Sequence, residues 1–222
     1  PPKWQYGVMV MLQKKAKVDL VDQMRTIVLT EADFNFNNKI LGRLTLQKAE
    51  TAKAIPKEQY GSRNKMSAIE CALNKRLMFD ILRQTKKPVG ICSCDLHSCY
   101  DRVVHSFASL AMQRAGAPLR AIQSMFETIQ NLKHTVRTCH GDSELTFGGE
   151  DWREVDPLHG VGQGNGAGPA IWAVISTVFS DLLRDKGYGF KMDAPLSKLA
   201  LHLAGCGFVD GTDLLQIGLI ED

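Results

Sequence analysis

The sequence lacks several features that would have defined its class at once. None of its apolar runs reaches the ~18 residues that a membrane-spanning helix needs, and no small-residue cleavage site follows the short apolar patch near its N-terminus. It has no internal repeat and no GxxxxGK[ST] phosphate-binding loop. We therefore expect no membrane span, no signal peptide and no repeat architecture, and the chain is not expected to be a P-loop NTPase.

The cysteines of this 222-residue chain form no disulfide framework either. Six cysteines are too few for a disulfide framework at this length. Cys92 and Cys94 form a CxC pair, whereas zinc sites typically use CxxC pairs. We therefore expect reduced, structural thiols in an intracellular protein without a zinc site.

The net charge of +3 hides an uneven distribution of charge along the chain. Residues 1–87 contain 17 Lys and Arg against 8 Asp and Glu, whereas residues 88–222 contain 10 against 16. A basic half next to an acidic half indicates a contact with a polyanion on one side and a cluster of cation-binding carboxylates on the other. The alternative is that the uneven distribution of charge arises by chance and that these side chains only face solvent.

Hydrophobic periodicity predicts a mixed α+β chain. Strands are expected over 4–12, 25–29 and 89–95, and helices over 36–54, 66–85, 101–115, 118–132 and 170–189. Residues 134–149 predict a hairpin with a Gly-Asp turn, and 202–217 a second hairpin that turns at Asp210-Gly211. Helices packed on an antiparallel sheet fit this order better than βαβ winding.

Two carboxylates lie at predicted strand ends. Asp95 ends the run "VGICSCD", which we interpret as a buried strand, and Asp210 lies at the tip of the last hairpin. Bare buried carboxylates are costly, and two that lie together repel unless a divalent cation joins them. Their hard oxygen ligands favour Mg²⁺ or Mn²⁺ over zinc. Asp101 is instead expected to cap or open a helix.

A glycine-rich segment, "HGVGQGNGAGP", leads into the apolar helix. Glycine lets a backbone approach a ligand closely, so the segment could cradle a base pair or a sugar-phosphate. Residues 162–167 also satisfy GxGxxA of dinucleotide binding, but no buried strand precedes them and no βαβ unit surrounds them. A flexible loop is the remaining alternative.

The order of these segments resembles the reverse transcriptase domain of retroelements, of the non-LTR retrotransposon or group II intron kind. "CDLHSCYDRV" resembles the first catalytic motif, "GVGQGNGAGP" the Gly-x-x-Gln-Gly-x-x-x-x-Pro motif, and "GFVDG" the aromatic-x-Asp-Asp hairpin. Upstream, "RTIVL", "NNKILGRL" and "EQYGSR" resemble the two fingers motifs. The resemblance covers nearly the whole chain.

The resemblance implies a right-hand polymerase fold, with fingers at 1–88, a palm at 89–222, and 117–157 as a second segment that connects fingers and palm. It implies RNA-directed DNA polymerase activity, which is nucleotidyl transfer with an RNA template, a DNA primer and dNTPs. Asp95 and Asp210 would be catalytic and hold two Mg²⁺ ions. The residues implied in substrate binding are Tyr100 as the steric gate, Gln163 and Gly164 under the nascent base pair, and Arg25, Lys39 and Arg63 as cations of the fingers.

Two departures from the family pattern change these expectations. The second Asp of the family's hairpin is Gly211 here, which removes one carboxylate and is expected to weaken metal binding. The sequence ends nine residues after Asp213, so the family's thumb is expected to be missing. The alternative functions are a catalytically silent relic that binds nucleic acid, and a nucleotidyltransferase that uses a DNA template or no template.

Overall fold

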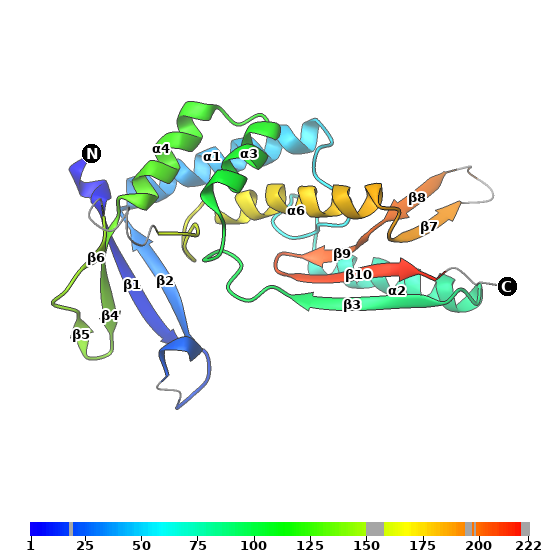
Figure 1. Ribbon diagram of the computed structural model, residues 1–222, viewed down its shortest axis with the longest axis horizontal. Helices are drawn as coiled ribbons and strands as arrows, with labels where there is room; N and C mark the ends of the chain where they lie inside the picture. The colour runs from blue at the N-terminus through cyan, green and yellow to red at the C-terminus, as the bar shows by residue number, and fades with distance from the viewer. Residues whose placement is uncertain (18–19, 150–157, 194–196, 198, 219–222) are drawn as a thin grey trace. The chain divides into compact units, whose positions relative to one another are not determined.

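The computed structural model describes residues 1–17, 20–149, 158–193, 197 and 199–218 (Figure 1). The chain divides into two compact units, and each unit combines two separate segments. Unit 1 comprises 1–47 and 98–171, and unit 2 comprises 48–97 and 172–222. The boundary predicted at 88/89 does not coincide with a limit of either unit. The predicted connecting segment 117–157 includes residues 150–157, which lie outside the described part.

Unit 1 contains a mixed sheet. Its strands are ordered β2-β1-β4-β5, and β6 also pairs with β4. β1 is antiparallel to β2 but parallel to β4. The strands are β1 (Tyr6–Gln13), β2 (Met24–Thr30), β4 (Lys133–Thr138), β5 (Gly141–Asp142) and β6 (Phe147–Gly148), with short 3₁₀ helices at η1 (Pro2–Gln5) and η2 (Val21–Gln23).

The helices of unit 1 supply its apolar core. They are α3 (His105–Arg114), α4 (Leu119–Gln130) and the first part of α1 (Ala32–Thr51). Met112 of α3 and Ile122 of α4 are fully buried, and Phe34 of α1 is 2% exposed. Helix α4, which lies within the predicted range 118–132, buries Ile122, Met125, Phe126 and Ile129 at helical spacing.

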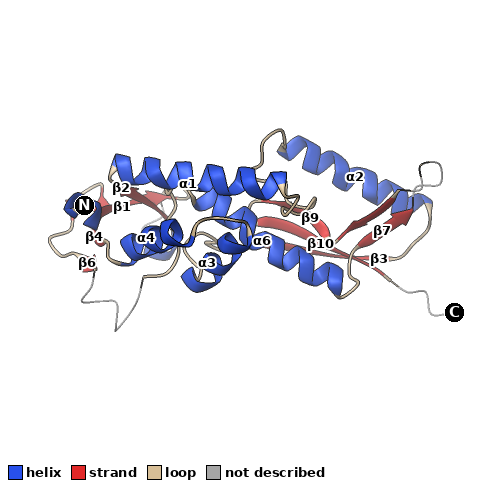
Figure 2. Ribbon diagram, turned by 90° about the horizontal axis from the view of Figure 1, so that it is seen from above, coloured by secondary structure: helices blue, strands red, loops and turns tan. Residues whose placement is uncertain are grey.

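Unit 2 contains an antiparallel sheet in the order β3-β10-β9, and a separate β7-β8 pair (Figure 2). The strands are β3 (Val89–Asp95), β7 (Phe190–Asp193), β8 (Ala200–Leu203), β9 (Gly205–Phe208) and β10 (Gly211–Ile217). Helix α2 (Ala68–Gln84) contributes Cys71, Met78 and Leu82 to a core that also holds Leu215 of β10. Helix α6 (Gly168–Asp185) begins in unit 1 and continues into unit 2.

Helix α2 has a clear local signal at its start. The Ser67 hydroxyl accepts a hydrogen bond from Glu70 N, and the Glu70 carboxylate accepts one from Ser67 N. This capping box satisfies two backbone donors that a helix N-terminus otherwise leaves free. It explains why the helix begins at Ala68, close to the predicted start at residue 66.

Two local predictions were wrong. The helix expected from Asp101 begins only at His105, and Asp101 lies in a turn whose backbone closely approaches Gly160. The hairpin of β4 and β5 turns at Cys139-His140, so Gly141-Asp142 forms a strand. At Asp101 a tertiary contact overrides the local signal, because the loop of Gly160 occupies the space beside it. Asp142 instead forms an exposed ion pair with its register partner Arg137 inside the hairpin.

The two units do not separate the charges as the two halves of the sequence do. Unit 1 has 13 Lys and Arg against 12 Asp and Glu, and unit 2 has 14 against 12. Each unit is nearly neutral because it combines a basic segment with an acidic one. Contacts with a polyanion must therefore be assigned to individual cations rather than to a uniformly basic unit.

All six cysteines are free thiols in the structure. Burial raises the pKa of Cys206 to about 12, and Cys71 and Cys99 are also buried. Cys92 and Cys139 are exposed, so these two do not belong to the core. Within the described residues, no helix is long and apolar enough to cross a membrane.

Unit 1 is predicted to lose stability in mild acid because of His134. Burial lowers the pKa of His134 to about 4, against about 6.5 in an unfolded chain. Between these values the unfolded state binds more protons, so the free energy of unfolding should fall as pH falls, by about 2 kcal/mol at pH 5. Denaturant-induced unfolding at pH 5 and at pH 7.5 tests this prediction. His134→Asn should reduce the difference in the free energy of unfolding between the two pH values, whereas His140→Asn, at an exposed position, should not. The same difference in His134→Asn as in the natural chain would contradict the prediction.

Candidate polymerase site

The hairpin of β9 and β10 turns one residue earlier than the sequence predicts. Gly211 pairs with Phe208, so the two turn residues are Val209 and Asp210. Val209 takes the positive φ of the turn, at 58°, and Gly211 is an ordinary strand residue. The predicted Asp210-Gly211 turn was therefore wrong by one position, although Asp210 does lie at the tip.

Asp95 and Asp210 lie at the same end of neighbouring strands. Asp95 is the register partner of Gly211 in the antiparallel β3-β10 pair. Beyond this pair, Leu96 N donates a hydrogen bond to Asp210 O at 3.3 Å. The structure thus brings together the ends of the two strands that carry the predicted catalytic carboxylates.

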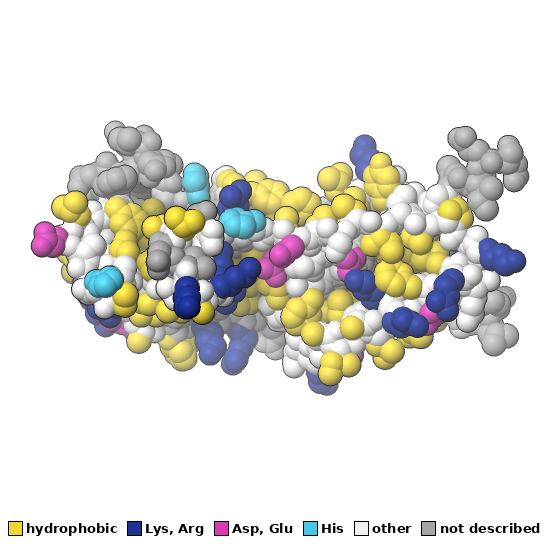
Figure 3. All heavy atoms as spheres, turned by 90° about the horizontal axis from the view of Figure 1, so that it is seen from below, with side chains coloured by type: hydrophobic (Ala, Val, Ile, Leu, Met, Phe, Trp, Pro, Cys, Tyr) yellow, Lys and Arg dark blue, Asp and Glu magenta, His cyan; other side chains and the backbone are white. Residues whose placement is uncertain are grey.

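Strand β3 is not buried, contrary to the prediction. It is an edge strand in the described sheet, and most of its residues are exposed, Asp95 included. Ile91 is 49% exposed. Figure 3 views the molecule from the side on which β3 lies in Figure 1 and shows hydrophobic side chains with Lys and Arg among them. Asp95 is therefore in contact with solvent, and burial does not by itself require a partner for it.

Asp213, two residues after Gly211, has partners of its own within unit 2. Its carboxylate forms an ion pair with Lys75 and accepts a hydrogen bond from Ser93 Oγ at 2.6 Å. The Lys75 ammonium, followed by the Ser93 hydroxyl, holds the pKa of Asp213 below its usual range. Asp213 is thus already engaged inside unit 2.

The carboxylates present fit a hard divalent cation in chemistry but not in number. Asp95 and Asp210 offer the oxygen ligands that Mg²⁺ prefers. In the described part of the chain, no group of three or more His, Cys, Asp or Glu side chains could hold a metal ion. A cation here would depend on water and on substrate phosphates for its remaining ligands, as Mg²⁺ often does.

The glycine-rich loop of unit 1 lies tightly against strand β2. Val28 N donates a hydrogen bond to Gln163 O at 2.7 Å. At Gly164, which has φ of 121°, an added Cβ would lie 2.5 Å from Val28 O. Only glycine allows this approach, so the loop is a fixed structure rather than a flexible connection.

Asn35 is a second anchor of this loop that the sequence analysis missed. Its Nδ2 donates to Gly164 O at 3.0 Å, and its Oδ1 accepts from Gly166 N at 2.6 Å. The signal was weak, because Asn35 lies in the run "DFNFNNK" among other asparagines. Asn35 fixes the conformation of the loop that carries Gln163.

Tyr100 lies beside the end of this loop. Its carbonyl accepts a hydrogen bond from Val161 N at 2.8 Å, and its half-buried ring packs against Gly168, where an added Cβ would lie 3.5 Å from Tyr100 Cδ1. Tyr100, Gln163 and Gly164 all belong to unit 1, whereas Asp95 and Asp210 belong to unit 2.

The three predicted cations differ in their surroundings. Lys39 is exposed on α1, and its Cβ lies 2.7 Å from the position of an added Cβ at Gly166. Arg25 is exposed on β2. Arg63 is held by Glu50 and by two carbonyls, and its side chain is only 9% exposed. A phosphate would have to compete with these partners for Arg63.

The comparisons with known proteins agree with this fold. The sequence model of the family described as reverse transcriptase (RNA-dependent DNA polymerase) matches residues 12–198. The chain belongs to the reverse transcriptase family, whose members are RNA-directed DNA polymerases. No curated protein sequence matches it significantly.

Solved telomerase structures are similar to this chain. Apo telomerase from Candida tropicalis, truncated from its C-terminal domain, has a TM-score of 0.61 at 12% identity, over 97% of this chain and 44% of that chain. Telomerases in complex with the TWJ fragment of telomeric RNA have TM-scores of 0.59 at 13% identity for C. tropicalis, over 97% and 36%, and 0.54 at 12% identity for Candida albicans, over 96% and 39%. This chain spans less than half the length of these telomerases, and such identities show the fold alone.

Proposed function

We propose that the chain is the fingers and palm of an RNA-directed DNA polymerase from a retroelement of the non-LTR or group II intron kind. One observation carries the proposal: the register places Asp95 opposite the residue that follows Asp210. Two carboxylates at adjoining strand ends suit nucleotidyl transfer with Mg²⁺ or Mn²⁺, because carboxylate oxygens are ligands that these cations prefer. A bound cation would polarise phosphate oxygens and lower the pKa of the primer hydroxyl.

The remaining residues have supporting roles in this proposal. Asp95 and Asp210 would hold the cation, and the anchored loop of Gln163 and Gly164 would lie under the nascent base pair. Lys39, next to that loop, is a better candidate for a phosphate contact than Arg63, because Arg63 is engaged with Glu50. The proposed partners are an RNA template, a DNA primer and dNTPs.

Primer extension tests the proposal directly. The chain is incubated with dNTPs and a DNA primer on an RNA template, on a DNA template, or without a template, in Mg²⁺ or Mn²⁺. We expect extension on RNA that requires the divalent cation. Equal extension without a template would instead support a template-independent nucleotidyltransferase.

Gly211 favours a second candidate, a catalytically silent relic that binds nucleic acid. The register puts Gly211 directly opposite Asp95, where a family member would place its second carboxylate. RNA binding without any extension, in either cation, would support this candidate.

RNA binding is predicted to depend on salt through individual cations. Each phosphate contact releases counterions, so log affinity should fall with log salt by about 0.7 per contact for a single strand. Lys39→Gln should make this slope shallower by about 0.7, the value for one phosphate contact. Arg120→Gln, which changes an exposed cation on α4, is the control and should leave the slope unchanged. Salt-independent binding would argue against a phosphate-binding role.

Sugar selection is predicted to depend on the Tyr100 ring. A ring at the gate position fills the space that a 2′-hydroxyl needs, so Tyr100→Ala should raise the incorporation of ribonucleotides relative to deoxynucleotides by about tenfold or more. Tyr188→Ala in unit 2 is a matched control. The measurement is the ratio of incorporation on one template, and an unchanged ratio would identify Tyr100 as a packing residue only.

A further inference from the structure

The residue before Asp210 has a conformation that its side chain disfavours. Val209 has φ of 58°, in the left-handed region. A β-branched residue is a real outlier there, and such outliers persist only when surrounding contacts hold them. Val209 is half-buried and forms the turn with Asp210. Contacts from other parts of the chain must therefore hold Val209 in this conformation at the tip of the hairpin.

The side-chain amide of Gln59 binds both backbone groups of Val209. Gln59 Oε1 accepts a hydrogen bond from Val209 N at 3.1 Å, and Gln59 Nε2 donates to Val209 O at 3.4 Å. Gln59 Oε1 also accepts from Gly61 N at 2.9 Å. Gln59 is 3% exposed, so this amide acts as a buried partner for a backbone that has turned out of the sheet.

Two other contacts surround the same residue. Trp172 Nε1 donates to Val209 O at 2.7 Å. Gly61 approaches so closely that an added Cβ would lie 2.4 Å from Val209 N. Alternative conformations of Val209 would therefore leave buried polar groups unpaired, which carries a free-energy cost that opposes the relief of strain.

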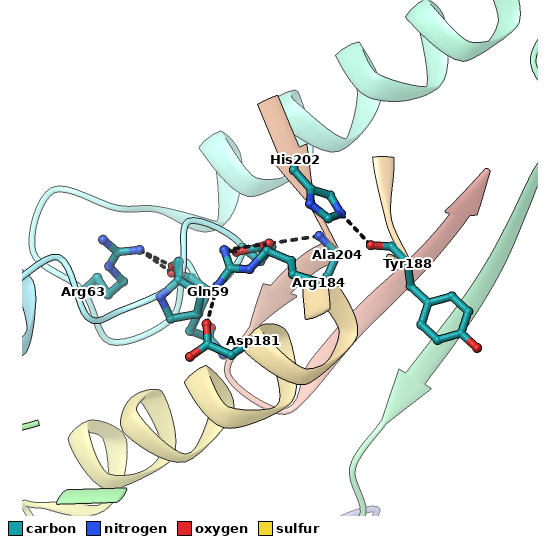
Figure 4. A network of polar contacts seen from close by, with 9 residues as sticks. Gln59, Arg63, Asp181, Arg184, Tyr188, His202 and Ala204 are labelled. Carbon is teal, nitrogen blue, oxygen red and sulfur yellow. Dashed lines mark hydrogen bonds and ion pairs between the residues drawn. The ribbon is translucent and has the colours of Figure 1, made fainter. Parts of the chain in front are cut away.

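The segment that carries Gln59 is itself fixed (Figure 4). Glu58 is buried, and its carboxylate accepts hydrogen bonds from Ala204 N and from the Arg184 guanidinium, which also pairs with Asp181. On the other side, the Arg63 guanidinium donates to Gln59 O at 3.0 Å. Backbone hydrogen bonds join Tyr60 N to Gly207 O and Gly207 N to Glu58 O. Gln59 thus acts from a rigid support.

We infer that Gln59 is a positioning residue, which holds Val209 in the left-handed conformation and thereby fixes the backbone of Asp210 at the end of β3, next to Asp95. Gln59 does not contact the substrate in this role; it acts through the backbone of the turn. This lock on the Val209 backbone is independent of function, and only its effect on catalysis rests on the proposed polymerase activity.

Hydrogen exchange tests the lock without any activity. In the natural chain the Val209 amide should be protected, because its donor is bonded to a buried acceptor. Gln59→Met preserves the size of the side chain and removes its hydrogen bonds. We expect Val209 protection to fall at least tenfold in this variant. Tyr60→Phe is the matched control, since it removes the contact of Tyr60 with Asn74 and should leave Val209 protected.

A second pair of variants keeps the test decisive if Gln59→Met fails to fold. Val209→Asn places a residue that tolerates the left-handed region, and Val209→Thr keeps the β-branched strain. The Asn variant should melt at a higher temperature than the Thr variant. An equal or reversed order, or a Val209 amide that exchanges freely in the natural chain, would overturn the inference.

Primer extension then separates the lock from the function. In a chain that extends primers, Gln59→Met should lower the rate on the order of 100-fold, because small misplacements of a catalytic group have effects of this size. Adding Val209→Asn to Gln59→Met should restore part of the rate, whereas a purely structural Gln59 would give additive effects. Unchanged extension in Gln59→Met would overturn the inference. Absence of extension from every chain would overturn only the proposed function.

Discussion

Replacing Gly211 by Asp is expected to raise primer extension by about 100-fold or more. The new carboxylate would lie directly opposite Asp95, since cross-strand partners share one face of the sheet. It would add a hard oxygen ligand for the cation. Electrostatic stabilisation by a single positioned group is commonly worth two or three orders of magnitude in rate.

The structure removes a cost that the sequence alone attaches to this substitution. With Asp210-Gly211 as the turn, a new side chain would have to adopt positive φ. Gly211 is in fact a strand residue outside the left-handed region, and an added Cβ would meet only Phe208 O, at 3.8 Å. The remaining cost is the repulsion between carboxylates, which a bound cation offsets.

Melting curves over a series of Mg²⁺ concentrations should therefore distinguish the effect of the new charge at position 211 from the effect of the larger side chain. Without Mg²⁺, Gly211→Asp should melt slightly below the natural chain, and its melting temperature should rise more steeply with Mg²⁺. Gly211→Asn has nearly the same size without the charge, and it should show neither effect. If the natural chain matched the Gly211→Asp variant in both melting and primer extension, Gly211 would not impair cation binding or activity.

The sequence located most of the elements because their signals are local. The capping box of Ser67 and Glu70 marks the start of α2, and the apolar spacing of α4 marks its buried face. Positions set by distant contacts were missed. The Asp-Gly pair favours a turn at 210–211, but Gln59 and Trp172 bind Val209 and select a turn at 209–210.

The adjoining strand ends at the candidate site were predictable, but the residues that support them were not. Asp95 and Asp210 could be paired because both end apolar runs, and the register confirms that these ends adjoin. Asn35 and Gln59 act through backbone groups more than a hundred residues away, so no spacing rule reveals them. The burial of β3 was wrong for a related reason: an apolar composition does not say whether a strand is central or at an edge.

Replacing Asp95 by Asn is expected to reduce primer extension on the order of 1,000-fold in whichever chain is more active, natural or Gly211→Asp. Asn has the size of Asp but lacks its charge, so the cation would lose one of its anionic ligands. Without Mg²⁺ the same variant should melt at the same temperature or higher, because it removes a like charge from the end of the sheet. Activity and stability would thus change independently.

Asp213→Asn in β10 is the matched control for that prediction. It breaks the contact with Lys75 and weakens the one with Ser93, and because this pair is partly exposed we expect a loss of about 1 kcal/mol in the free energy of unfolding. Extension should change little, since Asp213 is engaged away from the turn. If both variants lost activity in proportion to stability, the carboxylates would be structural. Loss of extension in Asp95→Asn without loss of stability would instead identify Asp95 as a group that acts on the substrate through a cation.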